Sequence, residues 1–202
     1  MKFYNFICSI LSFLISIIFR FEVQGQENLP NEGNIILIAN HKSFLDPVFM
    51  LVAIKNRRII PVAKKELFKI PVLGYLMRKI EVIPIDREKP GISTVKEILR
   101  QIKSGRVLGI FPEGTRSNMQ VFMPAKPGVA MFAIKSKSNV VPMSIITTYK
   151  PFSKVKVVIG ETVNLKHYHI NKVPKTEYDS IAQDLMNHVI KNYEKNKSGI
   201  IK

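Results

Sequence analysis

Two side chains that could act together in proton transfer, His41 and Asp46, stand five positions apart in the chain. A carboxylate that holds one nitrogen of an imidazole fixes its tautomer and raises its basicity, so the pair could take a proton from a hydroxyl group. On a regular helix the two would point about 140° apart. They therefore need a loop that doubles back before a helix starting at Pro47, since proline is favoured at the first helical position. The alternative interpretation makes Asp46 an ordinary helix N-cap and His41 a loop residue.

A second cluster of polar residues, Phe111–Ser117, could bind an anion. Gly114 permits a tight turn. The hydroxyls of Thr115 and Ser117, the guanidinium of Arg116 and nearby backbone amides could then converge on a phosphate. In isolation, the same residues could also form a solvated turn with a surface arginine.

A third cluster lies where the apolar segment Ile83–Ile85 runs into Asp86 and Arg87. Like the other two, it follows a segment with the pattern of a strand. A local surface ion pair between Asp86 and Arg87 is the alternative.

Motifs for several other chemistries are absent from the sequence. It contains no Gly-x-Ser-x-Gly nucleophile motif and no glycine-rich nucleotide-binding loop. Its one cysteine, Cys8, excludes a disulfide framework and a Cys-x-x-Cys metal or redox site. A route through a serine acyl-enzyme therefore has no support in the sequence.

The hydrophobic pattern predicts an α/β fold, with a mostly parallel sheet flanked by helices. Ligands of such sheets collect at the carboxyl ends of the strands, which is where all three clusters fall. Strands are predicted over 34–39, 58–63, 80–85, 106–111, 140–145 and 154–159, helices over 47–55, 71–79, 92–103, 128–136 and 176–195, and a turn-rich linker over 26–33.

The amino-terminal segment is apolar and predicts a membrane-associated helix. From Phe3 to Phe19 it carries no charge, and Lys2 and Arg20 bound it. Its length is at the short end of the roughly 17–25 residues that span a bilayer, so a helix lying in the membrane interface is favoured. A short transmembrane helix and a signal peptide ending at Gly25 are the alternatives. The chain is accordingly divided into this segment, residues 1–25, and an α/β domain, residues 26–202.

The charge balance points to an anionic partner. The chain has 31 Lys and Arg residues against 15 Asp and Glu residues, a formal net charge of +16. Such a field attracts nucleic acid, acidic proteins or anionic lipid head groups. The basic residues are scattered and many aromatics lie in the amino-terminal segment, which disfavours nucleic acid. We expect an anionic membrane surface as the partner. If the amino-terminal segment spans the membrane, the Lys and Arg excess after Arg20 places the domain on the cytoplasmic face.

The clusters, in this order, resemble the conserved blocks of the glycerolipid acyltransferase family, specifically its bacterial 1-acylglycerol-3-phosphate acyltransferases. The resemblance covers residues 25–160, and Glu81 departs from it because the second block often begins with glycine. The matching residues are His41 and Asp46 for a His-x-x-x-x-Asp motif, Ile85–Arg87 for the end of the second block, Phe111–Ser117 for a Phe-Pro-Glu-Gly-Thr-Arg-Ser block without a substitution, and Val141–Met143 for a hydrophobic-Pro block.

The resemblance implies that a fatty-acyl group moves in one step from a thioester to the sn-2 hydroxyl of 1-acylglycerol-3-phosphate, giving phosphatidic acid. The donor would be acyl-CoA or acyl-acyl carrier protein, and no metal or bound cofactor is implied. His41 would take the proton from the hydroxyl and Asp46 would orient His41. Acyl transfer to another lysolipid or alcohol, and hydrolysis of the thioester, are the alternatives. The acceptor phosphate would be held by Arg87 and Arg116, in a site shaped by Glu113, Gly114 and Thr115.

Overall fold

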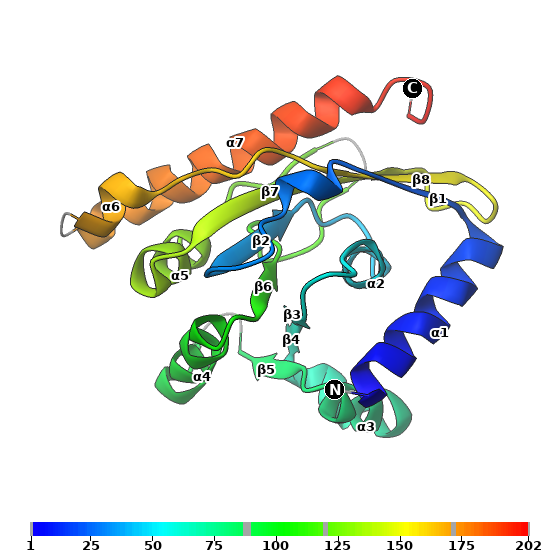
Figure 1. Cartoon of the computed structure of the whole chain (residues 1–202), viewed down its shortest axis with the longest axis horizontal. Coiled ribbons are helices and arrows are strands. Elements are labelled where there is room, and N and C mark those ends of the chain that lie inside the picture. The colour runs from blue at the N-terminus through cyan, green and yellow to red at the C-terminus, as the bar shows by residue number, and fades with distance from the viewer. Residues whose placement is uncertain (1, 87–89, 119–120, 171–172, 202) are drawn as a thin grey trace.

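A six-stranded sheet runs through the centre of the molecule in the order β1-β8-β7-β2-β6-β3 (Figure 1). The computed structural model describes residues 2–86, 90–118, 121–170 and 173–201. All neighbouring strands of the sheet are parallel except β7 and β8, so the mostly parallel sheet expected from the sequence is confirmed. Its strands are β1 (Arg20–Gln24), β2 (Ile35–Ala39), β3 (Ile59–Ile60), β6 (Val107–Ile110), β7 (Asn139–Thr147) and β8 (Lys154–Ile159).

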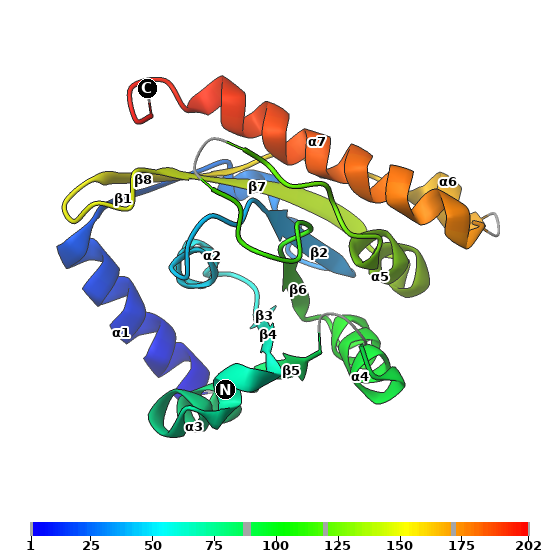
Figure 2. The same cartoon turned by 180° about the vertical axis from the view of Figure 1, so that it is seen from behind.

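Helices cover both faces of this sheet because its central strand is apolar on both sides. In β2, Ile35 and Leu37 pack into one core, while Ile36 and Ile38 pack into the other, as the two-residue period of a strand requires. The predicted flanking helices are therefore confirmed (Figures 1 and 2). The first core contains residues of α1 (Lys2–Ile18) and α2 (Asp46–Ala53), and the second contains residues of α4 (Ile92–Lys103), α5 (Gly128–Ser136) and α7 (Tyr178–Asn196). The shorter helices are η1 (Gln26–Asn28), α6 (Lys166–Ile170) and η3 (Lys175–Glu177).

A second sheet consists of the parallel strands β4 (Val62–Lys64) and β5 (Ile83–Ile85). The single strand predicted over residues 58–63 is wrong, because the chain divides at Pro61 into β3 and β4, which join different sheets. Proline has no N–H for a strand ladder, whereas its carbonyl accepts a hydrogen bond from the Ile83 amide at 2.9 Å. Between β4 and β5 lie a 3-10 helix, η2 (Lys65–Lys69), and α3 (Pro71–Lys79).

A turn at Glu81 delays the start of β5 relative to the predicted strand over residues 80–85. Glu81 has a φ of 60°, a left-handed conformation that glycine adopts without steric cost, which fits the glycine common at this position in the resembling family. The Glu81 carboxylate accepts a hydrogen bond from Arg106 at 2.6 Å and pairs with Arg58 at 3.2 Å. The Arg106 hydrogen bond, together with the two guanidinium charges, holds the pKa of Glu81 below its usual value. This carboxylate thus links the end of α3 to the residues that precede β3 and β6.

β1 is a strand that the sequence analysis does not predict. It pairs residue by residue with β8, from Arg20 opposite Lys154 onward. Phe21 and Val23 pack against the first core, and the carboxylate of Glu22 pairs with Lys154 at 2.6 Å. The apolar amino-terminal segment therefore leads directly into the edge of the main sheet.

α1 packs one side against the body and exposes another. Tyr4 and Ile15 are buried, whereas Phe6, Phe13 and Ile17 are exposed. Within the described residues, no helix combines the length and the apolar character that crossing a membrane requires. The interfacial position of this helix stays a prediction.

Candidate active site

Three neighbouring strands bring the candidate site to one edge of the main sheet. β2 ends two residues before His41, β6 ends just before Phe111, and β7 ends two residues before Tyr149. Because β6, β2 and β7 are adjacent and parallel, their carboxyl ends lie at the same edge. The expectation that the first two clusters meet at strand ends is therefore confirmed.

His41 and Asp46 meet through a loop that doubles back. The Nδ1 atom of His41 lies 3.1 Å from Oδ2 of Asp46. The same oxygen accepts hydrogen bonds from the backbone amides of Lys42 and Ser43, each at 2.6 Å. The N-cap position of α2 belongs to Leu45, so Asp46 is not a helix N-cap. Its buried carboxylate instead closes the loop and turns one nitrogen of His41 toward itself.

The imidazole of His41 is held on one face as well as at its edge. Its ring stacks on Phe111 with a centroid distance of 4.3 Å and an angle of 23°, and only 5% of the residue is exposed. With Nδ1 donating to Asp46, Nε2 is the nitrogen that can accept a proton. No described residue forms a hydrogen bond with Nε2. The geometry therefore leaves one basic nitrogen for a ligand.

The second cluster holds the backbone of His41 in place. The His41 amide donates to one carboxylate oxygen of Glu113 at 2.7 Å, and the Met123 amide donates to the other at 2.9 Å. The carbonyl oxygen of His41 accepts hydrogen bonds from the backbone amide of Ser117 at 2.8 Å and from its hydroxyl at 3.2 Å. Glu113 is 1% exposed, and a buried carboxylate needs such donors. Glu113 thus acts on the site through the backbone of the histidine.

The turn after Glu113 carries an exposed cation to the edge of the site. Gly114 has a φ of 69°, and a Cβ atom there would lie 3.0 Å from the Lys126 side chain. Thr115 and Arg116 are exposed. The Arg116 guanidinium lies over the Phe44 ring, 3.5 Å from its centroid, so a side chain of the His41–Asp46 loop contacts it. No carboxylate of the described residues pairs with Arg116, which leaves this charge available to an anion.

The third cluster follows β5 and so belongs to the smaller sheet. The carboxylate of Asp86 lies 2.5 Å from the ammonium of Lys65. Asp86 thus forms an ion pair with a lysine of η2. Arg87 itself lies outside the described residues, and its role in binding stays a prediction.

Tyr149 is a member of the site that the sequence analysis missed. Its hydroxyl donates to Oδ1 of Asp46 at 2.6 Å, and its ring stacks on Phe49. Burial, and next the charge of Asp46, raise the pKa of this phenol well above its usual value. Its φ is 58°, an uncommon conformation for a bulky residue. A separation of 103 residues explains why no local pattern indicated this contact.

Replacing Tyr149 by phenylalanine is expected to lower the free energy of unfolding by about 2 kcal/mol, because a buried carboxylate loses one donor. Urea unfolding measures this change. Tyr178→Phe is the matched control, since the Tyr178 hydroxyl has no hydrogen-bond partner among the described residues. Equal stability of the two variants would show that the Tyr149 hydroxyl does not support Asp46.

Two further residues of the first cluster position it. The side-chain amide of Asn40 donates to the carbonyl oxygen of Ile145 at 3.0 Å and accepts from its amide at 2.8 Å, so it extends the β2–β7 pairing by one step. The ammonium of Lys42 donates to the carbonyl oxygens of Asn118 and Val121 at 2.8 and 2.9 Å. Burial lowers the pKa of Lys42. Both contacts fix the ends of the loop that carries His41.

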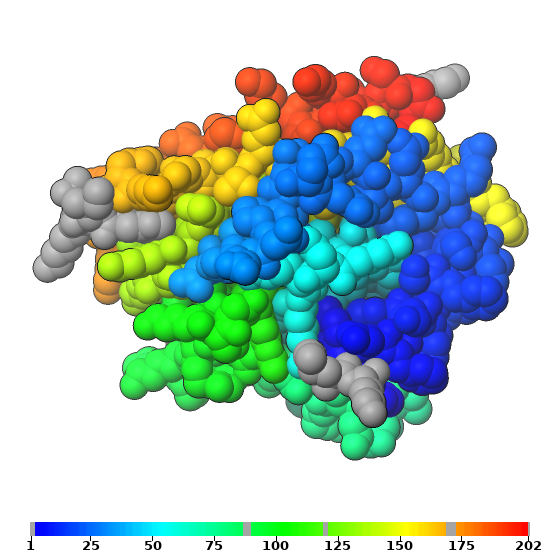
Figure 3. All heavy atoms as spheres, in the orientation of Figure 1, coloured from blue at the N-terminus to red at the C-terminus, as the bar shows by residue number. Residues whose placement is uncertain are grey.

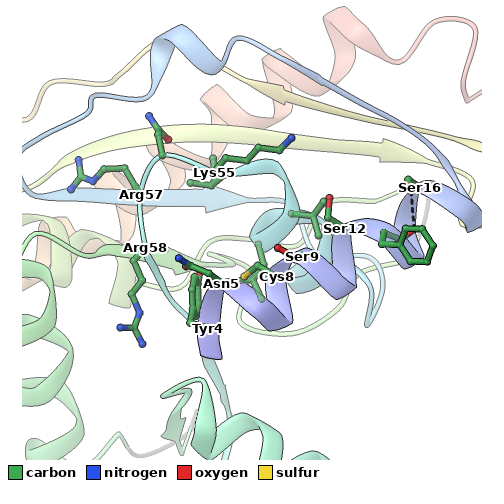
Figure 4. Close-up of a pocket in the computed structure, with 14 residues that line it drawn as sticks. Tyr4, Asn5, Cys8, Ser9, Ser12, Ser16, Lys55, Arg57 and Arg58 are labelled. Atoms are coloured by element: carbon green, nitrogen blue, oxygen red, sulfur yellow. Dashed lines mark hydrogen bonds between the residues drawn. The ribbon is translucent and has the colours of Figure 1, made fainter. Parts of the chain in front are cut away.

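A cavity of about 730 Å³ lies elsewhere, between α1 and the end of α2 (Figure 4). None of the candidate residues lines it. Of its two arginines, Arg57 donates to the carbonyl oxygens of Pro30, Gly33 and Gly105, and Arg58 pairs with Glu81. Their guanidinium groups are thus used within the protein. Across the described residues, no group of three or more His, Cys, Asp and Glu side chains could hold a metal ion.

Comparison with known proteins places the site in a family. The family model described as "Acyltransferase" matches residues 20–146. The 1-acyl-sn-glycerol-3-phosphate acyltransferase of Bacillus subtilis (strain 168) is 31% identical over 199 residues, which is 95% of this chain and 96% of that protein. The enzyme of the same name from Streptococcus pneumoniae (strain ATCC BAA-255 / R6) is 38% identical over 120 residues, which is 58% of this chain and 44% of that one.

A solved structure shares the fold. The crystal structure of the 1-acyl-sn-glycerophosphate (LPA) acyltransferase PlsC from Thermotoga maritima has a TM-score of 0.67 and 25% sequence identity, and the match covers 91% of this chain and 80% of that one. The family model spans the His41–Asp46 loop and the turn at Arg116. The resemblance seen in the sequence is therefore confirmed, and the chain is an enzyme that belongs to the acyltransferase family.

Proposed function

We propose that this enzyme transfers a fatty-acyl group from a thioester to the sn-2 hydroxyl of 1-acylglycerol-3-phosphate, forming phosphatidic acid in phospholipid biosynthesis. The observation that carries the proposal is the contact of His41 Nδ1 with Asp46 at 3.1 Å, beside the exposed guanidinium of Arg116. A base for a hydroxyl and a cation for a phosphate thus stand on contacting loops. The names of the Bacillus and Streptococcus relatives support the choice of acceptor.

The chemistry needs one basic nitrogen and no protein nucleophile. Nε2 of His41 takes the proton of the acceptor hydroxyl as its oxygen attacks the thioester carbonyl carbon. The C–S bond then breaks, and the leaving thiolate receives the proton from the imidazolium. The Asp46 carboxylate keeps Nδ1–H oriented and stabilises the imidazolium while it exists. The products are the acylated phospholipid and the free thiol, so no oxidant, metal or bound cofactor takes part.

The acceptor phosphate is assigned to Arg116, with Arg87 as its partner from the second block. A guanidinium fork suits the oxygens of a phosphate better than an ammonium does. The Arg116 guanidinium lies over the ring of Phe44, three residues after His41, so the anion site and the base are close in the fold. Gly114 and Thr115 form the turn that carries this arginine, and Glu113 acts through the His41 backbone.

The donor and the location are further parts of the proposal. Acyl-CoA and acyl-acyl carrier protein are both anionic, and the net charge of +16 favours either one. The same charge, with the exposed apolar residues of α1, supports attachment to the anionic cytoplasmic face of a membrane. The acceptor lysolipid resides in such a membrane.

The reaction is tested by following thiol release from acyl-CoA and from acyl-acyl carrier protein, with purified full-length enzyme in detergent. We expect release that depends on added lysophosphatidic acid, with phosphatidic acid as the product. Release that is independent of the acceptor would instead identify a thioester hydrolase. Release with another lysolipid or alcohol, but none with lysophosphatidic acid, would identify a different acceptor.

Replacing Arg116 by alanine is expected to raise the KM for the lysolipid about 10- to 100-fold, since a charge-assisted contact of about 1.5–3 kcal/mol is lost. The KM for the thioester should change little. Arg100→Ala on α4 removes an equally exposed guanidinium and serves as the control. If a folded Arg116→Ala enzyme kept its lysolipid KM, the phosphate role of Arg116 would be wrong.

A further inference from the structure

The outer face of α3 is apolar, although it faces away from the protein. Val72, Tyr75 and Leu76 lie three and four positions apart and therefore share one face of the helix. Val72 is 73% exposed and Tyr75 is 55% exposed. The opposite face carries the buried residues Gly74 and Met77. A helix of a soluble protein turns its apolar stripe inward, so this one is reversed.

Close packing of α3 against η2 fixes which face of the helix is exposed. At Gly74 a Cβ atom would lie only 2.3 Å from the carbonyl oxygen of Phe68 in η2. Only glycine lets α3 approach η2 so closely. The helix therefore cannot rotate to bury Val72 without losing this contact, and the exposed stripe is a fixed property of the fold.

Positive charge flanks the apolar stripe. Lys69, Arg78 and Lys79 lie at the two ends of α3, and residues 67–80 include no acidic residue. The nearest carboxylates are already paired, Glu66 with Lys64 at 3.7 Å and Glu81 with two arginines. Lys79 lies over the Tyr75 ring, 5.6 Å from its centroid. A helix that lies in a membrane interface typically has such an apolar stripe, with tyrosine, lysine and arginine around it.

α3 also lies next to α1, the helix that the proposed function places on a membrane. Arg58 connects them, because its guanidinium lies over the Tyr4 ring of α1 at 4.9 Å and pairs with Glu81, two residues after α3, at 3.2 Å. In the space-filling view the surfaces of the two helices adjoin (Figure 3). Both α1, in which Phe13 is 65% exposed, and α3 are visible on the face of the molecule that Figure 3 shows.

We infer that α3 is a second membrane contact, which inserts Val72, Tyr75 and Leu76 into the interface of an anionic bilayer. This inference rests on the proposed function, in which α1 attaches the protein to a membrane, and it adds α3 as a second attached helix. Two contacts that are not collinear fix the orientation of the protein on the membrane, whereas α1 alone would let it rotate about the helix axis.

The chain contains no tryptophan, so one introduced tryptophan reports on a single position. We would prepare Val72→Trp, Phe13→Trp as the α1 reference, and Ser180→Trp on α7 as the control far from both helices (Figure 1). Vesicles would contain phosphatidylglycerol and acyl-brominated phosphatidylcholine. The bromine atoms quench only indoles that lie among the lipid acyl chains. Strong quenching at positions 72 and 13, and little at position 180, is expected.

The outcomes separate the inference from the proposed function. Quenching at position 13 with none at position 72 would overturn the role of α3 and leave α1 as the membrane contact. Quenching at neither position would contradict membrane attachment itself. Equal quenching at all three positions would mean that the protein has no defined orientation, and would also overturn the inference.

A second measurement does not depend on fluorescence. Val72→Asp places a charge on the exposed stripe, so folding should be unaffected, and affinity for the same vesicles should fall about tenfold or more. Ser180→Asp adds the same charge on α7 and should leave affinity nearly unchanged. An equal loss of affinity in both variants would show that only the net charge of the protein matters, and would contradict insertion of α3.

Discussion

His41→Ala is expected to lower turnover about 10²- to 10⁴-fold, the usual contribution of a positioned general base. Thiol release in the presence of lysophosphatidic acid measures the loss. His188→Ala on α7 is the matched control, because His188 is exposed and far from the site in sequence. The control should retain full activity.

The fold of the His41→Ala enzyme must be checked, because the imidazole stacks on Phe111. The backbone clamp from Glu113 and Ser117 contacts only main-chain atoms of residue 41, so alanine keeps it. We expect a native circular dichroism spectrum and cooperative urea unfolding. Turnover within tenfold of the parent enzyme would show that another group takes the proton.

Asp46→Asn is expected to lower turnover about 10²- to 10³-fold while preserving the loop. Oδ2 of Asp46 accepts from His41 and from the amides of Lys42 and Ser43, so the asparagine oxygen must take this position. The asparagine amide then faces Tyr149, whose hydroxyl can accept a hydrogen bond. The tautomer of His41 is retained, and the loss reports the negative charge that opposes the imidazolium.

Asp46→Ala serves as the contrasting variant. It leaves two part-buried backbone amides without this acceptor, each costing up to about 1–3 kcal/mol, so it should unfold at a lower urea concentration than Asp46→Asn. If Asp46→Asn kept parent activity, the charge of Asp46 would have no part in the reaction. If it unfolded as readily as Asp46→Ala, the loop would need the carboxylate for its geometry.

The sequence was most informative where chemistry and local pattern coincide. The central strand β2 is a continuous apolar run, and the residue types that follow it specify an imidazole and a carboxylate. A proline at position 47 allowed a loop in which His41 and Asp46 meet, and the family resemblance favoured this interpretation over a helix N-cap. The match of Phe111–Ser117 to a family block likewise located the second half of the site.

What the sequence could not supply are contacts between distant segments. Tyr149 reaches Asp46 from 103 residues away, and no periodicity encodes that approach. β1, which pairs with β8, was missed because residues 1–25 were assigned to the membrane-associated segment, although Phe21 and Val23 alternate with polar residues as in a half-buried strand. The residues around Pro61 were compatible with one continuous strand. The break at Pro61 depends on β3 and β4 joining different sheets, which the local sequence does not indicate.

The role of Glu113 shows a different limit. Its type and place suggested a residue that shapes the acceptor site, as the resemblance implies. In the fold its two oxygens accept hydrogen bonds from the His41 and Met123 amides. A motif match identifies which residues matter. It does not show whether such a residue contacts the substrate itself or holds another residue that does.

The short connection between α1 and β1 has a mechanical consequence. α1 ends at Ile18 and β1 begins at Arg20, and the intervening Phe19 is buried against Phe49. A flexible tether would let a catalytic domain tumble above its anchor, but this junction transmits every tilt of the helix to the sheet edge. With both α1 and α3 resting on a membrane, the height of His41 above it would therefore be set by the fold. Under the proposed function, a lysolipid would then reach the base by diffusing laterally to a fixed point, and lengthening this junction with a few glycines should uncouple helix and sheet.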